Sequence, residues 1–152
     1  MKPEQRLAEL NIQLPQPPAA VANYVPVVVS GKQIWISGQV PFRDGGLGPL
    51  GLVGSDLTVE QAVEEARWCA INILAQLQAN LTSLNAVKRI VKLQVFVASA
   101  PGFVAQPQVA NGASDLMVEV FGDAGKHARS AVGVSALPLG VPVEIDAVAE
   151  IV

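Results

Sequence analysis

Apolar side chains recur along this chain at two periods, and these periods predict where helices and strands lie. Between residues 59 and 81 they return every three or four positions, which predicts an amphipathic helix. Thr58 and Gln61 stand at the start of this stretch with the spacing of a capping box. A second helix is predicted from about residue 103 or 107 to 121, and Gly122 is its expected stop.

The other apolar segments alternate with a period of two, which is typical of strands. Residues 21–37 predict a hairpin with Gly31-Lys32 as its turn. Residues 129–136 and 141–152 predict two further strands, and the last of these has an acidic face opposite an apolar one. A strand is also expected over residues 87–98, with four apolar residues on one face: Val91, Leu93, Val95 and Val97.

The predicted order ββαβαββ defines an α+β fold, with two amphipathic helices packed on one face of a mixed sheet. A short helix over residues 3–11 precedes it, and the glycine-rich segment 41–56 is expected to be a flexible rim. We expect a single domain over residues 1–152, with 1–19 as an extension and about 20–152 as the core. Two helices leave the second face of the sheet uncovered, so association with copies of the same chain is the simplest way to bury it.

Composition narrows the classes of function. The chain is 51% apolar and 15% charged, and its net charge of −3 disfavours a nucleic-acid partner and an anionic membrane surface. No apolar run is long enough for a transmembrane helix, and residues 1–14 lack the apolar region of a signal peptide. Cys69 is the single cysteine, which fits a reducing cytoplasm. With His127 as the single histidine, a zinc ligand set is not expected.

Arg129 is the most informative charged residue, because it heads an apolar, strand-like run that contains no other charge. The negatively charged group that pairs with Arg129 is therefore expected to come from another part of the chain or from a ligand. It is either a distant side chain, such as Glu144 or Asp146 across strands, or the carboxylate of a ligand. A planar guanidinium holds a carboxylate with two hydrogen bonds. The residues alone leave both alternatives open.

Several segments spread over residues 20–152 together resemble the Rid family of reactive-intermediate deaminases, also called the YjgF or L-PSP endoribonuclease-like family. These segments are Tyr24 with its hairpin, Ser37-Gly38-Gln39-Val40-Pro41, the strand 87–97, Ala128-Arg129-Ser130, Leu137-Pro138 and the stretch 143–149. The resemblance implies a chorismate-mutase-like fold. It also implies a homotrimer whose sheets form a central barrel, with three clefts between subunits.

Enzymes of that family hydrolyse 2-imino or 2-enamino acids to 2-keto acids and ammonia. The resemblance therefore implies this reaction, with a small carboxylate-bearing imine, enamine or keto acid as partner. It implies that Arg129 holds the substrate carboxylate, with help from the backbone N–H of Ala131, and that Glu144 positions or activates water. The other residues expected to line the cleft are Tyr24, Ser37, Gly38 and Asn111. No metal or organic cofactor is implied, because a 2-imine is already electrophilic and needs orientation and a directed water.

The chain departs from better-known members of the family at two positions. His127 and Ala131 replace the proline and the cysteine that flank the Ala-Arg-Ser triplet there. The extension and the glycine-rich loop resemble a longer branch, so a non-catalytic binder or sensor of small carboxylates is the alternative function. Ribonuclease activity or translation inhibition is disfavoured by the acidic charge. On its own pattern, His127 is predicted to be a surface turn residue, and Cys69 a packed side chain.

Overall fold

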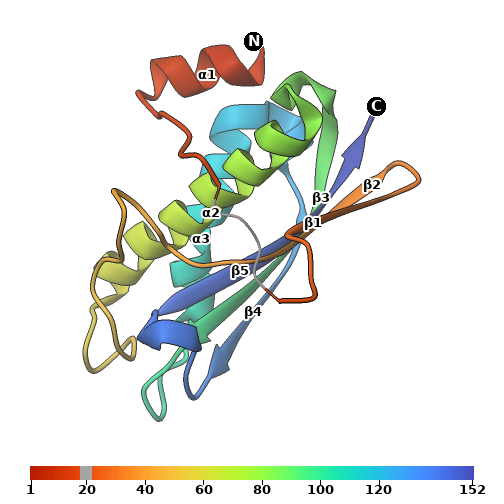
Figure 1. The fold of residues 1–152 in the computed structure, drawn as a ribbon. Coiled ribbons are helices and arrows are strands. Elements are labelled where there is room, and N and C mark those ends of the chain that lie inside the picture. The colour runs from red at the N-terminus through yellow and green to blue at the C-terminus, as the bar shows by residue number, and fades with distance from the viewer. Residues whose placement is uncertain (18–21) are drawn as a thin grey trace.

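A five-stranded mixed sheet with two long helices across one of its faces forms the body of the protein (Figure 1). The computed structural model describes residues 1–17 and 22–152. The elements are α1 (Pro3–Glu9), β1 (Val27–Ser30), β2 (Gln33–Gln39), α2 (Val59–Leu81), β3 (Val87–Ala98), α3 (Gln106–Phe121), β4 (Ala128–Val134) and β5 (Val143–Ile151), with 3-10 turns at Leu84–Ala86, Gly122–Gly125 and Pro138–Gly140. The strands lie in the order β1-β2-β5-β3-β4, in which β3 and β4 are parallel and the other neighbours antiparallel. The predicted α+β class is confirmed.

The two long helices begin and pack as their sequence pattern predicts. The Thr58 hydroxyl accepts the Gln61 N–H at 3.1 Å, and the Gln61 side chain accepts the Thr58 N–H at 2.9 Å, which completes the capping box. α2 and α3 come together at Gly112, where a Cβ would lie 2.1 Å from the backbone oxygen of Val63. Glycine is required there, because no side chain fits in that contact. None of the helices in the described ranges is long and apolar enough to cross a membrane.

One prediction for β3 is wrong. The pairing of β3 with β5 shifts register between Ile90 and Lys92, and such a bulge changes which residues face the core. Ile90 is buried in the core and Val91 is only half-buried, whereas the rest of the predicted apolar face is correct. The alternation is interrupted at this point, because Ile90 and Val91 are consecutive apolar residues, and the sequence alone does not decide which of the two faces the core.

The hairpin turns at Gly31-Lys32, and Gly31 has a φ of 61°, which favours glycine. β1 begins only at Val27, so Tyr24 precedes the strand, and the strand is shorter than predicted. Val21, the predicted start of the hairpin, lies outside the described residues. The expected boundary near residues 19–20 also lies outside them.

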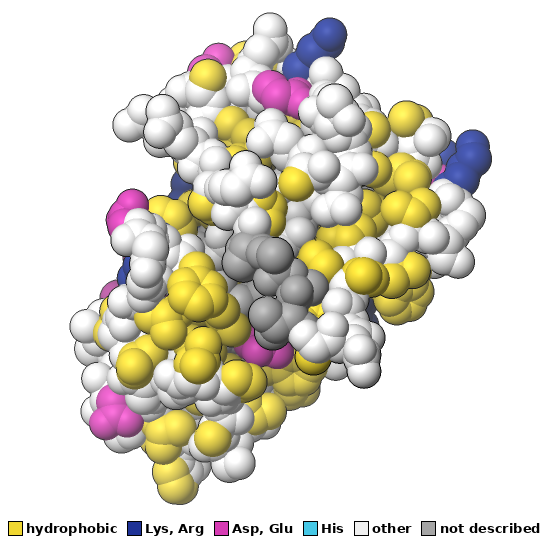
Figure 2. Space-filling view, viewed as in Figure 1, with side chains coloured by type: hydrophobic (Ala, Val, Ile, Leu, Met, Phe, Trp, Pro, Cys, Tyr) yellow, Lys and Arg dark blue, Asp and Glu magenta, His cyan; other side chains and the backbone are white. Residues whose placement is uncertain are grey.

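The face of the sheet opposite the helices is partly apolar. Cross-strand pairing aligns Val28 with Trp35, and Trp35 with Val148, while Phe96 aligns with Val132 further along the sheet. Trp35 is 51% exposed in the single chain. Figure 2 shows apolar side chains gathered over the β1–β2 hairpin, at the right of the view. The second face of the sheet is therefore uncovered in one copy of the chain, as the element order predicted.

The N-terminal helix α1 is held against the rest of the fold by polar contacts. Glu4 accepts hydrogen bonds from the Ser83 hydroxyl at 2.6 Å and from the Leu84 N–H at 2.8 Å. Arg6 Nε donates to the backbone oxygen of Glu119 at the end of α3, at 2.8 Å. The predicted N-terminal helix thus packs on the body of the fold.

The glycine-rich loop, residues 41–56, is anchored to α2 and so differs from the flexible rim that its composition predicts. The Arg43 guanidinium donates to both oxygens of the Glu65 carboxylate, at 2.8 and 2.5 Å. It also lies 5.5 Å from the ring centre of Trp68, within the range of a cation–π contact. Glu65 is only 1% exposed, so this ion pair lies largely out of water.

We expect Glu65→Ala to lower the free energy of unfolding by about 3 kcal/mol, because it leaves the half-buried Arg43 without its counter-charge. Urea denaturation measures this loss. The matched control is Glu64→Ala, at an exposed position one residue earlier, which should change stability by less than about 0.5 kcal/mol. Equal losses in the two variants would show that the ion pair does not hold the loop.

Candidate functional site

A pocket of about 290 Å³ lies beside the irregular stretch of β2, between Ile36 and Gln39, where its register with β5 shifts. Four of the predicted site residues line this pocket: Tyr24, Ser37, Gly38 and Glu144. The remaining lining residues are Pro26, Gln39, Val40, Phe42, Asn72, Gln76 and Pro138. The bulged end of β2, the start of the glycine-rich loop and one face of α2 therefore meet around Glu144.

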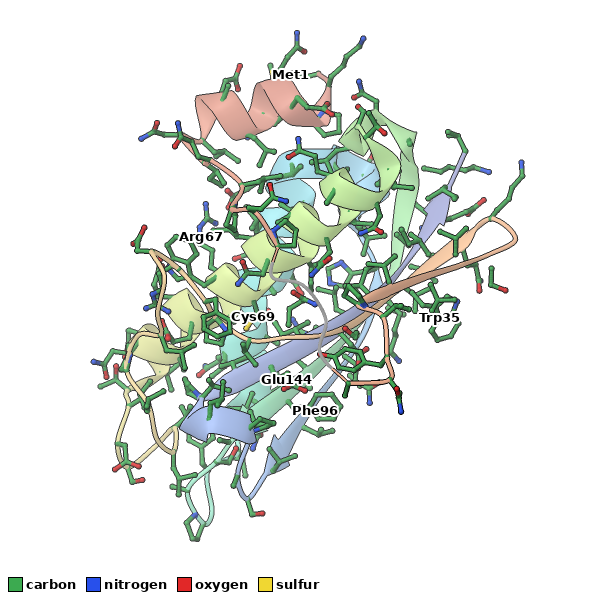
Figure 3. The ribbon with its side chains drawn as sticks, in the orientation of Figure 1. Met1, Trp35, Arg67, Cys69, Phe96 and Glu144 are labelled. Carbon is green, nitrogen blue, oxygen red and sulfur yellow. The ribbon has the colours of Figure 1, made fainter. Side chains whose placement is uncertain are left out.

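Glu144 projects from β5 onto the face of the sheet that the helices leave uncovered (Figure 3). Gly38 approaches it so closely that a Cβ there would lie 2.5 Å from Glu144 Oε2, so a larger residue would force the Glu144 side chain to move. Burial, and after it the negative charge of Asp146, raises the pKa of Glu144 above its ordinary value. A carboxylate with a raised pKa is a better proton acceptor at neutral pH than an ordinary one.

Arg129 lies in the edge strand β4 opposite Leu93, so its side chain projects from the helix-covered face of the sheet. Its Nη1 donates to Asn111 Oδ1 at 2.8 Å and to Ser114 Oγ at 3.2 Å, both on α3. Both acceptors are neutral, and within the described ranges Arg129 makes no ion pair. Within one chain the guanidinium is therefore oriented without having its charge neutralised.

The backbone N–H of Ala131 points toward the free edge of β4. The oxygen of Val134 accepts the Ser99 N–H at 3.0 Å, on the side where β3 continues. In a strand, the N–H and C=O of one residue point to the same side, and alternate residues point to opposite sides. Ala131, three residues before Val134, therefore presents its N–H at the same open edge as Arg129.

The predicted site residues thus fall into two groups that one chain does not bring together. Arg129, Asn111 and Ala131 lie at the β4 edge, whereas the group around Glu144 lies on the opposite face of β5. β3 separates β4 from β5 in the sheet. A single small molecule cannot reach both Arg129 and Glu144 of the same copy.

Two polar residues of α2 that line the pocket were not predicted from the sequence. Asn72 and Gln76 are buried on α2 and line the pocket next to Glu144. Asn72 Nδ2 donates to the backbone oxygens of Val40 and Phe42, at 2.9 and 3.0 Å, and so fixes one wall of the pocket. The two amides lie four residues apart, beside the apolar stripe of the helix, and this spacing is the signal in the sequence that places them on one face.

His127 is not the simple surface turn residue that was predicted. Its Nε2 lies 2.8 Å from Ser114 Oγ, and its Nδ1 lies 2.6 Å from the backbone oxygen of Gly125. Cys69 is fully buried, and burial raises the pKa of its thiol, which agrees with a packed side chain. Among the residues that the structure describes, no cluster of three or more His, Cys, Asp or Glu side chains could hold a metal ion.

A family model described as "YjgF/chorismate_mutase-like, putative endoribonuclease" matches residues 4–151. The chain therefore belongs to the YjgF/chorismate mutase-like family, and its fold is the one the sequence resemblance implied. It is 50% identical to Protein TCP17 of Trypanosoma cruzi over 146 residues, which is 95% of this chain and 91% of that protein.

Solved structures show the same fold. The protein Atu1372 of Agrobacterium tumefaciens, described as having unknown function, is 48% identical, with a TM-score of 0.93 over 99% of this chain and 92% of that one. TdcF of E. coli, solved with bound serine, is 26% identical, with a TM-score of 0.64 over 89% of this chain and 93% of that one.

The raised pKa values of Glu144 and Asp146 make a prediction about stability. Burial raises both pKa values, so near and above the ordinary carboxyl value of about 4 the folded state binds more protons than the unfolded state. These two groups therefore lower the stability as the pH rises through that range. We expect Glu144→Gln to gain stability relative to the wild type between pH 4 and 7, as measured by urea denaturation. Glu64→Gln, at an exposed position, is the control. If the difference in unfolding free energy between Glu144→Gln and the wild type does not change with pH, the raised pKa is contradicted.

Proposed function

We propose that the protein hydrolyses reactive 2-imino or 2-enamino acids to 2-keto acids and ammonia, in clefts between copies of the chain. The observation that carries this proposal is the state of Arg129. Two neutral acceptors hold both Nη1 hydrogens, and none of the described residues accepts from Nε or Nη2. That edge of the guanidinium has the geometry to bind a ligand carboxylate with two parallel hydrogen bonds.

The separation of Arg129 from Glu144 supports a site built from two copies. The pocket around Glu144 of one copy would face the β4 edge of the next copy, which carries Arg129, Asn111 and the Ala131 N–H. Apolar side chains on the uncovered face, including Trp35 and Val132, would be buried by the same association. The family resemblance implies three copies. A contact between two different surfaces of the chain, repeated by a threefold rotation, closes into a ring of three.

The chemistry needs only orientation and a directed water. Arg129 binds the substrate carboxylate, and the Glu144 carboxylate takes a proton from water as its oxygen bonds to C2 of the imine. The C2–N double bond becomes a single bond as the nitrogen takes up the proton that Glu144 received from water. The C2–N bond then breaks as the C2 hydroxyl gives its proton, through Glu144, to the leaving nitrogen, and the products are a 2-keto acid and ammonia. Holding water and imine together in this way accounts for much of the expected acceleration.

The other residues of the pocket would shape and orient the substrate. Tyr24 and Ser37 line the pocket, and Gly38 leaves room for the Glu144 side chain. Asn111 positions Arg129, and the N–H of Ala131 offers a further donor to the substrate carboxylate. The single, buried cysteine fits a reducing, cytoplasmic setting for this reaction.

A second candidate function is the binding of a small amino or keto acid without turnover. TdcF, a relative with the same fold, was solved with serine bound. This alternative requires Arg129 but does not require Glu144. Ligand-dependent thermal stabilisation that survives Glu144→Gln, in a protein that releases no ammonia, would favour it. A ribonuclease role, which the family's description names, has little electrostatic support in a chain of net charge −3.

Arg129→Ala should lower kcat/KM for ammonia release from 2-aminoacrylate-type imines by about a hundredfold or more, because the substrate carboxylate loses its charged partner. Glu144→Gln should lower kcat by about a hundredfold or more, because it removes the proton acceptor. Arg89→Ala, which removes an exposed arginine on β3, is the control and should leave the rate unchanged. A wild-type protein that does not accelerate the hydrolysis of several such imines would refute the reaction.

The rate should also fall as the pH decreases through the pKa of Glu144, which lies above its ordinary value. Since the charge of Asp146 contributes to that raised pKa, Asp146→Asn should move the acid limb of the kcat/KM profile to lower pH. A limb that stays in place in this variant, or moves to higher pH, would assign it to another group.

A further inference from the structure

A chain of hydrogen bonds connects Arg129 to the turn before β4. It runs from the Gly125 carbonyl to His127 Nδ1, from His127 Nε2 to Ser114 Oγ, and from Ser114 Oγ to Arg129 Nη1. The distances are 2.6, 2.8 and 3.2 Å in that order. None of these contacts was expected from the sequence, because Ser114 and His127 come from different elements.

The direction of each hydrogen bond follows from the carbonyl at its end. A backbone oxygen can only accept, so His127 Nδ1 must carry the hydrogen in the bond to Gly125. In a neutral imidazole Nε2 is then an acceptor, and the single hydroxyl hydrogen of Ser114 points to it. The lone pairs of Ser114 Oγ are thereby left to accept from Arg129. The tautomer of His127 thus determines that Ser114 acts as an acceptor toward the guanidinium.

Both hydrogen-bond partners of His127 are fixed by α3. Ser114 belongs to α3, and Gly125 packs so closely against it that a Cβ would lie 2.1 Å from the backbone oxygen of Met117. The Gly125 carbonyl is therefore held in place by a contact that only glycine permits. His127 sits between two fixed points, and its ring orientation is determined by them.

We propose that Ser114 and His127 are positioning residues for Arg129, which hold its guanidinium so that the Nε–Nη2 edge faces the ligand. Ser114 and Asn111 together occupy both Nη1 hydrogens and leave the other edge for a carboxylate bound side-on. The positioning role rests on the proposed function, since it gives a geometry to the carboxylate site at Arg129. In this proposal His127, which stands where better-known relatives have proline, acts on Arg129 through Ser114 and does not contact the substrate.

Binding of pyruvate, a 2-keto acid of the product class, tests this role by calorimetry on the full-length protein. Ser114→Ala and His127→Phe should each weaken pyruvate binding by about tenfold, because a pre-oriented charged donor becomes mobile. The double variant should bind pyruvate no more weakly than either single variant, since both residues act through the same series of hydrogen bonds. His127→Gln retains an acceptor and Ser114→Thr retains the hydroxyl, so both should bind within about threefold of the wild type. Ser135→Ala, an exposed serine beyond the end of β4, is the control.

The outcomes separate the two proposals. If Arg129→Ala abolishes pyruvate binding while the Ser114 and His127 variants bind normally, the positioning role is refuted and the carboxylate site stands. Unchanged binding in Arg129→Ala, or no binding by the wild type, refutes the carboxylate site and the positioning role with it. If the variants lose thermal stability additively but keep their affinity, the network is only structural. In turnover assays the role predicts a raised KM with kcat within about twofold.

A second measurement does not depend on any ligand. His127 is the only histidine of the chain, so its ring nitrogens give a single set of NMR signals. The chemical shifts of the two nitrogens should show the Nδ1–H tautomer at neutral pH, and Ser114→Ala should shift the Nε2 signal. A predominant Nε2–H tautomer would reverse the hydrogen bond to Ser114 and overturn the inference.

Discussion

The arrangement of this protein depends on a sheet that its own helices cover on one face only. Each strand alternates, so β5 sends Val143, Ile145 and Ala147 into the core and Glu144 and Asp146 to the opposite face. On that face the carboxylates share the surface with exposed apolar side chains from neighbouring strands. In the proposed assembly a second copy would bury this apolar area and would also exclude water from Glu144, while its Arg129 would favour the charged carboxylate. The covering of the sheet and the environment of the site would then depend on the same contact.

The proposed site has two parts, the pocket around Glu144 and the β4 edge with Arg129, and each part is held in place by hydrogen bonds. On one side, Asn72 fixes the wall of the pocket, and Arg43 with Glu65 anchors the loop that continues from it. On the other side, Asn111 and Ser114 fix the guanidinium of Arg129 from α3. Asn72, Arg43 and Arg129 are each held by hydrogen bonds within their own chain. Association would then bring two partly ordered surfaces together, which lowers the ordering cost of positioning a small substrate.

Membership of the YjgF/chorismate mutase-like family establishes the fold of this chain, but it does not by itself establish a reaction. The relatives include a protein described only as having unknown function and another solved with serine bound. The proposal of deamination rests on two separate features of the chain: an arginine edge without an acceptor among the described residues, and a half-buried carboxylate. His127 is hydrogen-bonded to Ser114, which accepts from Arg129, and among the described residues no carboxylate pairs with that arginine.

The periodicity of the chain determined the parts of the fold that depend on local sequence. The α2 helix with its capping box, the Gly31-Lys32 turn and the two faces of β5 were all predicted, because each follows from residues close together along the chain. Arg129 could also be named, since a charge in an apolar strand is conspicuous, and Glu144 could be named because its segment resembles a known family. Their assignment as site residues remains a prediction.

Only the tertiary structure decided which of these residues share a surface. The bulge at Ile90 and Lys92 arises from pairing with β5, so alternation in β3 alone placed Val91 on the wrong face. The contact of Ser114 with His127 and Arg129 depends on how α3 docks against β4, and a lone histidine in a turn does not reveal its partner. That Arg129 and Glu144 lie on opposite faces follows from strand order and register. Register is set by long-range hydrogen bonding and by packing over the whole sheet, which no single segment of the sequence encodes.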